Sequence, residues 1–252
     1  MSGGAICAPG QDEAALALLC MEHPYIHKIQ AANERLLSTV AGLDDVAMAA
    51  PSLLPGWDRA MVLAHLANNA DAMRRCVEAA SQGQVAVMYP GGDDARNADI
   101  EAGRGLSAAV LESRLAESSR RLQEAFELAP QRAWEAKAIA RMGEVQIGAG
   151  LVLGRLREVE VHHVDLNGGY GPADWDYAWV VEEMDRAMLS LPARLPEDTA
   201  VVLTATDSDQ HWVAGSGDAV EISGPLAQIF AWVTGRATSV GGQEAPCLGP
   251  WR

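Results

Sequence analysis

The segment from Arg157 to Trp175, REVEVHHVDLNGGYGPADW, gathers side chains that can bind a metal or move a proton. They are Glu158, Glu160, His162, His163 and Asp165. Residues four apart on a helix share a face, so Glu158 and His162 project side by side, whereas Glu160 and His163 point elsewhere. An imidazole nitrogen and a carboxylate oxygen suit Zn²⁺ or a similar divalent ion. The pair alone is also compatible with an ordinary interaction on a helix surface, so a third ligand is needed.

The best candidate for that third ligand is His65, in the apolar run MVLAHLANNADAM. A histidine between Val62 and Leu66 needs either a buried partner or a metal, and a hydrogen-bonded core histidine is the alternative here. Helical bundles commonly build metal sites from facing helices, and a catalytic zinc site combines three protein ligands with a water or a substrate. His65, Glu158 and His162 together predict an open metal site between two helices.

Two neighbours on the same helix bear on this assignment. His163 lies about 100° around the helix from His162 and competes with it for the ligand role. The residue four positions before His163 is Val159, which favours His162. Asp165, three residues beyond His162, is placed to accept a hydrogen bond from the ring and orient it. A solvated aspartate near a helix end is the alternative.

The composition limits the partners. The chain of 252 residues is 49% hydrophobic and 21% charged, which is typical of a folded protein with a substantial core. Its 34 acidic and 19 basic side chains give a net charge of −15, which disfavours nucleic acid and anionic membranes as partners. An anionic substrate therefore needs arginines placed locally. Four cysteines without paired spacing, no basic and apolar leader, and no apolar run of transmembrane length indicate a protein of the reducing cytoplasm.

The elements that must position these residues are helical in the first two thirds of the chain. Residues 1–10 are expected to form a loose tail, and residues 12–43 a short helix, a break at Pro24 and a longer helix. Asp58 is a suitable N-cap for the helix that carries the first histidine ligand, and Ser107 for a later helix.

The two remaining parts of this region are less regular. Residues 82–105 are loop-like, with a possible short helix around Arg96. Residues 134–148 are ambiguous, and the alternation in GEVQIG favours extended structure. The helix with the two adjacent ligands is expected to run from about 149 to 166, and the pair Gly168 and Gly169 to end it.

After residue 169 the pattern changes. A helix is expected over 179–191, followed by three β-like runs, TAVVLTAT, HWVAGSG and AVEISG, and by a helix from Pro225 to Gly235. Three tryptophans of this part are expected in its core: Trp175, Trp179 and Trp232. The fold class is therefore α+β, with a helical metal-binding bundle at 11–169 and a smaller α+β domain at 170–252 that completes the substrate cleft.

Five stretches of the chain together resemble the mycothiol-dependent maleylpyruvate isomerase family. They are GWDRAMVLAHLANNADA, MYPGGDDARNADIEAG, RLREVEVHHVDL, GGYGPADW and VTGR. The resemblance covers nearly the whole chain after residue 12, and its combination of motifs is specific where each motif alone is not. It implies that the N-terminal half is a DinB-like four-helix bundle. The glycine-rich loop after Tyr89 and the Leu153–Gly154 region depart from the family pattern, at places where they could reshape the substrate pocket.

The resemblance also implies which residues act. The family's zinc ligands correspond to His65, Glu158 and His162, the same three reached from spacing, and two arginines, Arg96 and Arg236, are implied to matter for activity. Residues 170–252 contain four arginines and no lysine against 12 acidic residues, so a cation at the end of a helix is notable there. Guanidinium groups bind carboxylates in a bidentate way, which makes the two arginines candidates to clamp a dicarboxylate substrate. A surface salt bridge is the alternative for each.

The activity that the resemblance implies is thiol-dependent cis-trans isomerisation of maleylpyruvate to fumarylpyruvate. A zinc-bound low-molecular-weight thiol adds to the cis double bond, and the adduct rotates and expels the thiol. Mycothiol is the family default, and ergothioneine and glutathione are the alternatives. A metal-dependent thiol S-transferase of the same DinB-like superfamily is a second hypothesis. A third is that the metal is structural and the protein binds a ligand without catalysis.

Overall fold

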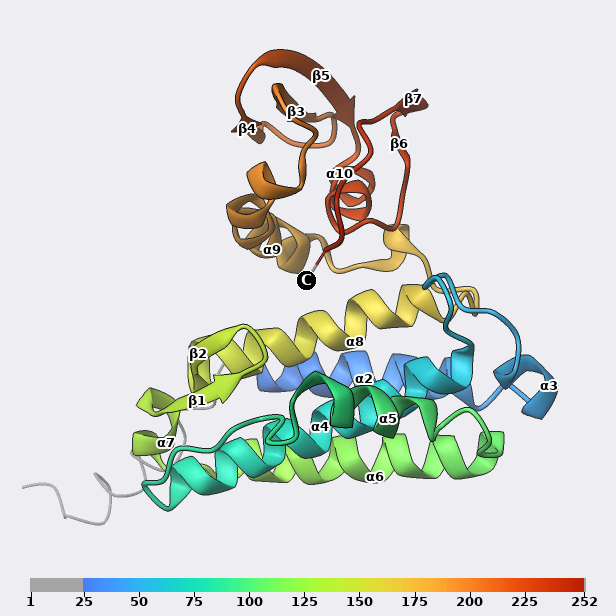
Figure 1. The fold of residues 1–252 in the computed structure, drawn as a ribbon, viewed down its shortest axis with the longest axis vertical. Coiled ribbons are helices and arrows are strands. Elements are labelled where there is room, and N and C mark those ends of the chain that lie inside the picture. Colours follow the sequence, from blue (N-terminus) through green and yellow to red (C-terminus); the bar gives the residue numbers. More distant parts are fainter. Residues whose placement is uncertain (1–24, 252) are drawn as a thin grey trace, which may run out of the picture.

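The computed structural model describes residues 25–251 (Figure 1). Four long helices lie side by side in the first two thirds of the chain: α2 (Ile26–Val40), α4 (Arg59–Ser81), α6 (Ala108–Glu127) and α8 (Leu153–Asp165). The helix α4 packs along α6, and α2 packs on both α6 and α8, so the four form a bundle. The tail expected at 1–10 and the short helix expected before Pro24 lie outside the described residues.

Two of the bundle helices, α4 and α6, begin where the sequence predicts. The carboxylate of Asp58 accepts a hydrogen bond from the backbone nitrogen of Met61 at the start of α4, and Ser107 caps α6 by accepting from Val110. Most residues of α4 are buried, as expected for a helix that packs against neighbours on nearly all sides. No helix in the described part of the chain has the length and apolar character needed to cross a membrane.

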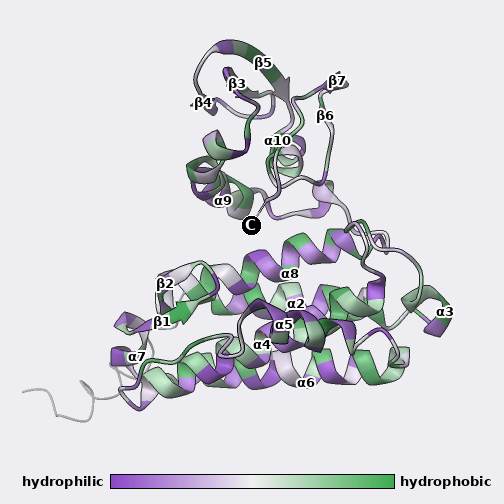
Figure 2. Ribbon diagram, in the orientation of Figure 1, coloured by the Kyte–Doolittle hydropathy of each residue, from purple (hydrophilic) through white to green (hydrophobic). Residues whose placement is uncertain are grey.

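Three short helices connect the long ones: α3 (Asp45–Met48), α5 (Gly92–Glu101) and α7 (Gln131–Glu135). The helix expected around Arg96 is α5, and this prediction is confirmed. It lies against α4, is coloured mainly as hydrophilic in Figure 2, and buries only Ile100. A thin polar helix therefore covers the segment of the bundle in which the first predicted ligand lies.

A hairpin precedes α8. Its strands β1 (Lys137–Ala140) and β2 (Gly143–Gln146) pair antiparallel, so the extended structure predicted for GEVQIG is confirmed. A π-helical stretch, Ile147–Val152, then leads into α8, which begins a few residues later than the sequence predicts. Glycine is a weak helix former, and a Cβ added to Gly150 would meet the Cβ of Val145 at 2.8 Å. The π-helical stretch thus packs closely against the hairpin at Gly150.

The chain after α8 forms a smaller unit, which lies over α8 in Figure 1. Its elements are two 3₁₀ turns (Pro172–Asp174 and Pro192–Arg194), helices α9 (Tyr177–Ser190) and α10 (Leu226–Val233), and strands β3 (Thr199–Ala205), β4 (His211–Gly215), β5 (Asp218–Gly224), β6 (Ser239–Val240) and β7 (Gln243–Glu244). In the main sheet β3 is central, antiparallel to β4 and parallel to β5. The three predicted strands, both predicted helices and the α+β fold class are confirmed.

Aromatic rings form the core of this C-terminal unit. Trp175, Trp179 and Phe230 pack edge to face, with ring centroids 5.1 to 5.9 Å apart, and all three are buried. Trp232 is also buried, and its indole nitrogen donates to the carbonyl of Pro246. The core positions predicted for the three tryptophans are confirmed. The Pro246 contact also holds the last segment of the chain against α10, near the boundary with the bundle.

Candidate metal centre

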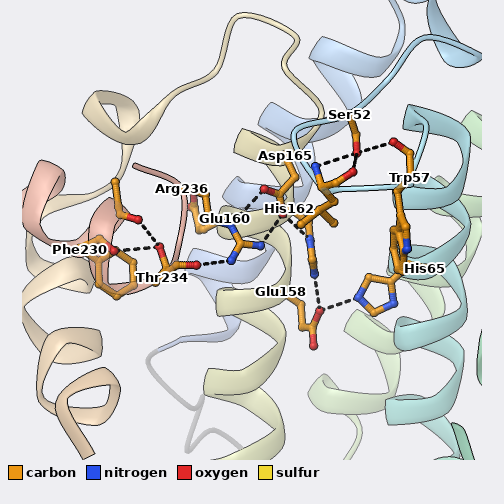
Figure 3. Close-up of polar contacts among 12 residues, drawn as sticks. Ser52, Trp57, His65, Glu158, Glu160, His162, Asp165, Phe230, Thr234 and Arg236 are labelled. Atoms are coloured by element: carbon orange, nitrogen blue, oxygen red, sulfur yellow. Dashed lines mark hydrogen bonds and ion pairs between the residues drawn. The ribbon is translucent and has the colours of Figure 1, made fainter. Parts of the chain in front are cut away.

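Three side chains from two helices converge on one another in the bundle (Figure 3). Glu158 and His162 project from α8, and His65 faces them from α4. The Oε2 atom of Glu158 lies 2.9 Å from His65 Nε2 and 3.2 Å from His162 Nε2. Tetrahedral zinc with ligands at about 2.0–2.1 Å separates its donor atoms by roughly 3.3 Å. These three residues can therefore hold a metal ion, and their role as its ligands stays a prediction.

The burial of the three ligands leaves one side of the cluster accessible. His65 is 3% exposed, while the side chains of His162 and Glu158 are 16% and 30% exposed. The ring of Trp57 packs edge-on against the His65 ring, with centroids 5.7 Å apart. A catalytic site needs such an accessible side for a water or a substrate, whereas a purely structural site is closed by a fourth protein ligand.

The ionisation of two of the three candidate ligands also fits a metal. Burial lowers the pKa of His65 to about 4, despite the opposing effect of the Glu158 carboxylate. Burial disfavours an ionised Glu158, but the two histidines outweigh it and hold the pKa of that carboxyl well below its ordinary value. At neutral pH His65 is therefore a neutral imidazole and Glu158 a carboxylate, which are the forms that bind a divalent cation. In the metal-free protein burial acts to lower the pKa of His162, but its hydrogen bonds to Asp165 and Glu158 outweigh burial and raise that pKa, so a metal must displace a proton there.

Asp165 binds the ring nitrogen of His162 that does not face Glu158. Its Oδ2 accepts a hydrogen bond from His162 Nδ1 at 2.7 Å, which leaves Nε2 facing Glu158. The Asp165 side chain is 1% exposed, so the alternative of a solvated aspartate is wrong. Arg236 reaches the same carboxylate from the C-terminal unit, through Nε at 3.0 Å and Nη2 at 2.6 Å. Two segments distant in sequence thus fix the orientation of one predicted ligand.

Both arginines named from the resemblance lie close to this cluster. Arg96 of α5 is half-buried; its Nη2 lies 3.3 Å from His65 Nδ1 and its Nη1 3.1 Å from Asn97 Oδ1. Among the described residues Arg96 makes no salt bridge with a carboxylate. Arg236 has a side chain only 9% exposed and pairs with a buried carboxylate. Neither is in the surface salt bridge that was the alternative, and their functional roles stay predictions.

The competing residues of α8 point away from the cluster. His163 stacks on Tyr170 with ring centroids 3.8 Å apart, and its Nε2 lies 2.7 Å from the hydroxyl of Thr39. The carboxylate of Glu160 accepts hydrogen bonds from Arg35 and from the Tyr170 hydroxyl. These contacts tie α8 to α2 and to the chain that follows α8. The structure therefore brings His162, and not His163, to the other two candidate ligands.

Arg155 is a positioning residue that the sequence reasoning missed. It is fully buried, and Nη1 donates to the Leu66 carbonyl at 2.9 Å and to Asn69 Oδ1 at 3.0 Å, while Nη2 donates to Ser119 Oγ at 3.1 Å. Burial lowers the pKa of its guanidinium to about 10. Arg155 precedes Glu158 by one helical turn, so it holds α8 against α4 at the level of the cluster. An arginine on the same face as a predicted ligand was the signal available.

The sequence that carries this site matches the model of a known protein family. The model of the mycothiol maleylpyruvate isomerase N-terminal domain matches residues 29–167, which is more than half of the chain and includes all three candidate ligands. The chain belongs to this family.

Solved structures agree with that assignment. The crystal structure of the mycothiol-dependent maleylpyruvate isomerase superposes with a TM-score of 0.82 at 26% sequence identity, covering 90% of this chain and 95% of that one. A variant of that enzyme, in which a histidine is replaced by alanine, gives the same values. Among curated proteins, no sequence matches the chain significantly. The family resemblance and the fold expected from it are confirmed.

This member of the mycothiol maleylpyruvate isomerase family has a pocket of about 720 Å³ next to the cluster. The bundle contributes the 53–55 loop and Asp165, and the C-terminal unit contributes Arg194, the 234–238 segment and the 248–251 segment. Asp165 connects the pocket with His162, to which it is hydrogen-bonded. Arg194 was not singled out by the sequence reasoning, although the scarcity of cations after residue 169 applies to it as much as to Arg236.

Proposed function

We propose that this protein is a metal-dependent cis-trans isomerase that converts maleylpyruvate to fumarylpyruvate with the help of a low-molecular-weight thiol. Mycothiol is the favoured thiol, and ergothioneine is a second candidate. The observation that carries the proposal is the convergence of His65, Glu158 and His162 around one accessible position, in a chain of the mycothiol maleylpyruvate isomerase family. The metal in this proposal is zinc or a similar divalent ion, because the donor set is two imidazoles and one carboxylate.

The thiol must come from outside the described part of the chain. When bound, the metal would stabilise the thiol as a thiolate, the form that acts as a nucleophile. Cys76 is buried, and burial raises the pKa of its thiol, so it stays protonated. Cys247 is exposed and is the other cysteine among residues 25–251. Neither belongs to the cluster, which supports a small-molecule thiol as the nucleophile.

The reaction needs only reversible addition. The sulfur forms a bond to one carbon of the cis double bond, and the π electrons move into the conjugated carbonyl, which leaves a single bond free to rotate. After rotation these electrons return, the carbon–sulfur bond breaks, and the trans product and the thiol are released. The thiol is regenerated, so the reaction consumes no co-substrate.

The residues around the cluster have distinct tasks in this proposal. Arg96 lies beside His65 and has no carboxylate partner among the described residues, so it is available to bind a substrate carboxylate. The guanidinium of Arg236 is already engaged: Nε and Nη2 donate to Asp165, and Nη1 donates to the carbonyl of Thr234. We therefore assign Arg236 to positioning, through Asp165 and His162.

An activity panel tests the proposal. Zinc-loaded protein is incubated with maleylpyruvate and with mycothiol, ergothioneine or glutathione, each with and without a chelator, and substrate, product and free thiol are quantified by chromatography. We expect at least one thiol to support many turnovers per thiol molecule, and chelation to abolish them. If chelation changes the rate with none of the thiols, the metal mechanism is wrong. If one thiol is consumed per electrophile, the protein is an S-transferase.

Matched histidine variants complete the test. We expect His65→Ala to lose both bound metal and activity, whereas His211→Ala, in an exposed position on β4, should retain both. Helicity measured by circular dichroism should be the same in both variants. A His65→Ala protein that keeps full activity contradicts the assignment of the site.

A further inference from the structure

The pocket between the bundle and the C-terminal unit carries an excess of positive charge in an acidic protein. Residues 170–252 hold 12 acidic residues and only four arginines, with no lysine. Arg186 pairs with Glu183 on α9, and Arg252 lies outside the described residues. The remaining two arginines, Arg194 and Arg236, both line this one pocket. Such clustering of scarce cations is expected where an anion is bound.

The two arginines differ in whether a carboxylate already pairs with their guanidinium group. Among the described residues that line the pocket, Asp165 is the one with a carboxylate, and it is already bound to Arg236 in a bidentate way. Arg194 has no carboxylate partner among the described residues. One negative charge thus faces two positive charges, and the uncompensated charge belongs to Arg194.

Within residues 25–251, the side chain of Arg194 is held by two backbone carbonyls. Its Nε donates to Gly249 at 3.1 Å and its Nη1 to Val233 at 2.6 Å, which anchors it between α10 and the last segment of the chain. The residue is 8% exposed, and its buried Nη2 atom has no hydrogen-bond partner in the described part of the chain. Burial, and next the neighbouring charge of Arg236, lower the pKa of Arg194. A buried guanidinium with a spare donor is costly unless a ligand satisfies it.

The rest of the pocket suits a small organic acid. Leu53 and Leu54 from the bundle and Leu248 from the C-terminal segment supply apolar surface, and the ring of Trp251 lies over the Arg236 guanidinium at 5.2 Å. A carboxylate is planar and accepts hydrogen bonds from a guanidinium, while the carbon chain that bears it packs against apolar groups.

We propose that this pocket is a carboxylate-binding subsite in which Arg194 binds one carboxylate of a reactant that reaches the metal centre. Because it identifies the bound carboxylate as part of a reactant, the inference rests on the proposed isomerase function. It assigns a role to a residue that neither the motifs nor the cluster identified. The carboxylate belongs either to the unsaturated diacid or to the thiol, and the two sources are separated by kinetics below.

Direct binding tests the subsite without turnover. The full chain, freed of metal by a chelator, is titrated with succinate, an unreactive dicarboxylate, and with neutral succinamide as its control. Binding is followed by calorimetry and by the ¹⁵N-indole resonance of Trp251, assigned with Trp251→Phe. We expect succinate to shift this resonance and succinamide to leave it unchanged. Absence of a succinate shift overturns the proposal.

Variants then assign the binding to one arginine. We expect Arg194→Gln to weaken succinate binding at least tenfold, while Arg186→Gln, which removes the same charge from the surface of α9, leaves it unchanged. Because Arg194 also donates hydrogen bonds to backbone carbonyls, Arg194→Lys provides a second variant, which retains the charge but not the bidentate guanidinium group. We expect it to bind succinate at least threefold more weakly than the wild type. A folded Arg194 variant of either kind that binds as tightly as the wild type overturns the proposal.

Kinetics identify the source of the carboxylate and separate this proposal from the function on which it rests. With Arg194→Lys, a raised KM for maleylpyruvate assigns the carboxylate to the diacid, and a raised KM for the thiol assigns it to the thiol. If the protein shows no isomerase activity but succinate binding depends on Arg194, the subsite is still supported and only the isomerase proposal is wrong. If the protein is an active isomerase but does not bind succinate through Arg194, only the subsite proposal is wrong.

Discussion

Arg236 donates two hydrogen bonds to Asp165, at 3.0 and 2.6 Å, and the same carboxylate accepts a third from His162 at 2.7 Å. The C-terminal unit is therefore connected to a candidate metal ligand through one buried side chain. Asp165→Asn keeps the shape but removes the charge that balances Arg236 and raises the basicity of His162. We expect metal affinity to fall roughly 10- to 100-fold. Competition with a chromophoric chelator measures it.

Asp209→Asn is the matched control, because it removes the same charge from an exposed position between β3 and β4. It should leave the metal affinity unchanged. Equal affinities of the Asp165→Asn and wild-type proteins would show that the buried carboxylate does not support the ligand.

Metal removal distinguishes a catalytic ion from a structural one. The bundle has its own apolar core, including Leu36, Leu66, Leu122 and Val159, so the metal-free protein should keep its helices. Zinc at 100 times its Kd adds about 2.7 kcal/mol to the free energy of unfolding, which raises Tm by roughly 5 to 11 °C. Calorimetry with and without zinc, and circular dichroism after chelation, check both. Loss of helicity on chelation would instead support the structural role.

The parts of the site that could be predicted from the sequence depend on local spacing. Glu158 and His162 lie one helical turn apart, so their shared face follows from helix geometry alone. His65 was conspicuous because it interrupts an apolar run. Asp58 and Ser107 mark helix starts by local hydrogen bonds and are found as caps. Each of these inferences needs only a few neighbouring residues.

The parts that could not be predicted depend on contacts across the fold. Arg236 and Asp165 are 71 residues apart, and Arg194 and Gly249 are 55 apart. No local pattern shows which of several arginines will meet a given carboxylate, or which will be left without one.

Arg96 should affect substrate binding and leave the metal in place. Arg96→Met removes a cation that can bind a substrate carboxylate, and losing such a charge-assisted contact costs about 2–5 kcal/mol. We therefore expect kcat/KM for maleylpyruvate to fall by roughly 30- to 5,000-fold, with the metal Kd changed less than about threefold. Steady-state kinetics on protein of known metal content measure the effect.

Arg120→Met on the exposed face of α6 provides the comparison for Arg96, because the Arg120 guanidinium pairs with Glu117 and Glu124 on its own helix. It should leave kcat/KM unchanged. Should Arg96→Met lose metal to the same extent as activity, the arginine supports the ligand His65 and does not bind the substrate.

His163 should make the stability of the metal-free protein depend on pH. Burial, and next the charge of Arg35, lower its pKa from 6.5 to about 4, although Asp174 acts in the opposite direction. Between these values the unfolded chain binds the proton and the folded chain does not. The contribution of neutral His163 to the free energy of unfolding is therefore complete above pH 6.5 and is lost as the pH falls towards 4.

His163→Phe retains a ring that can stack on Tyr170 but has no proton to bind. The free energy of unfolding of the variant should therefore fall less steeply between pH 6.5 and 4, by a slope difference of up to one proton. Urea unfolding of metal-free protein at several pH values gives both slopes. His65 titrates in both proteins, so its contribution cancels in the difference, and the lost hydrogen bond to Thr39 lowers stability without changing the slope. Parallel curves would show that His163 has an ordinary pKa in the folded protein.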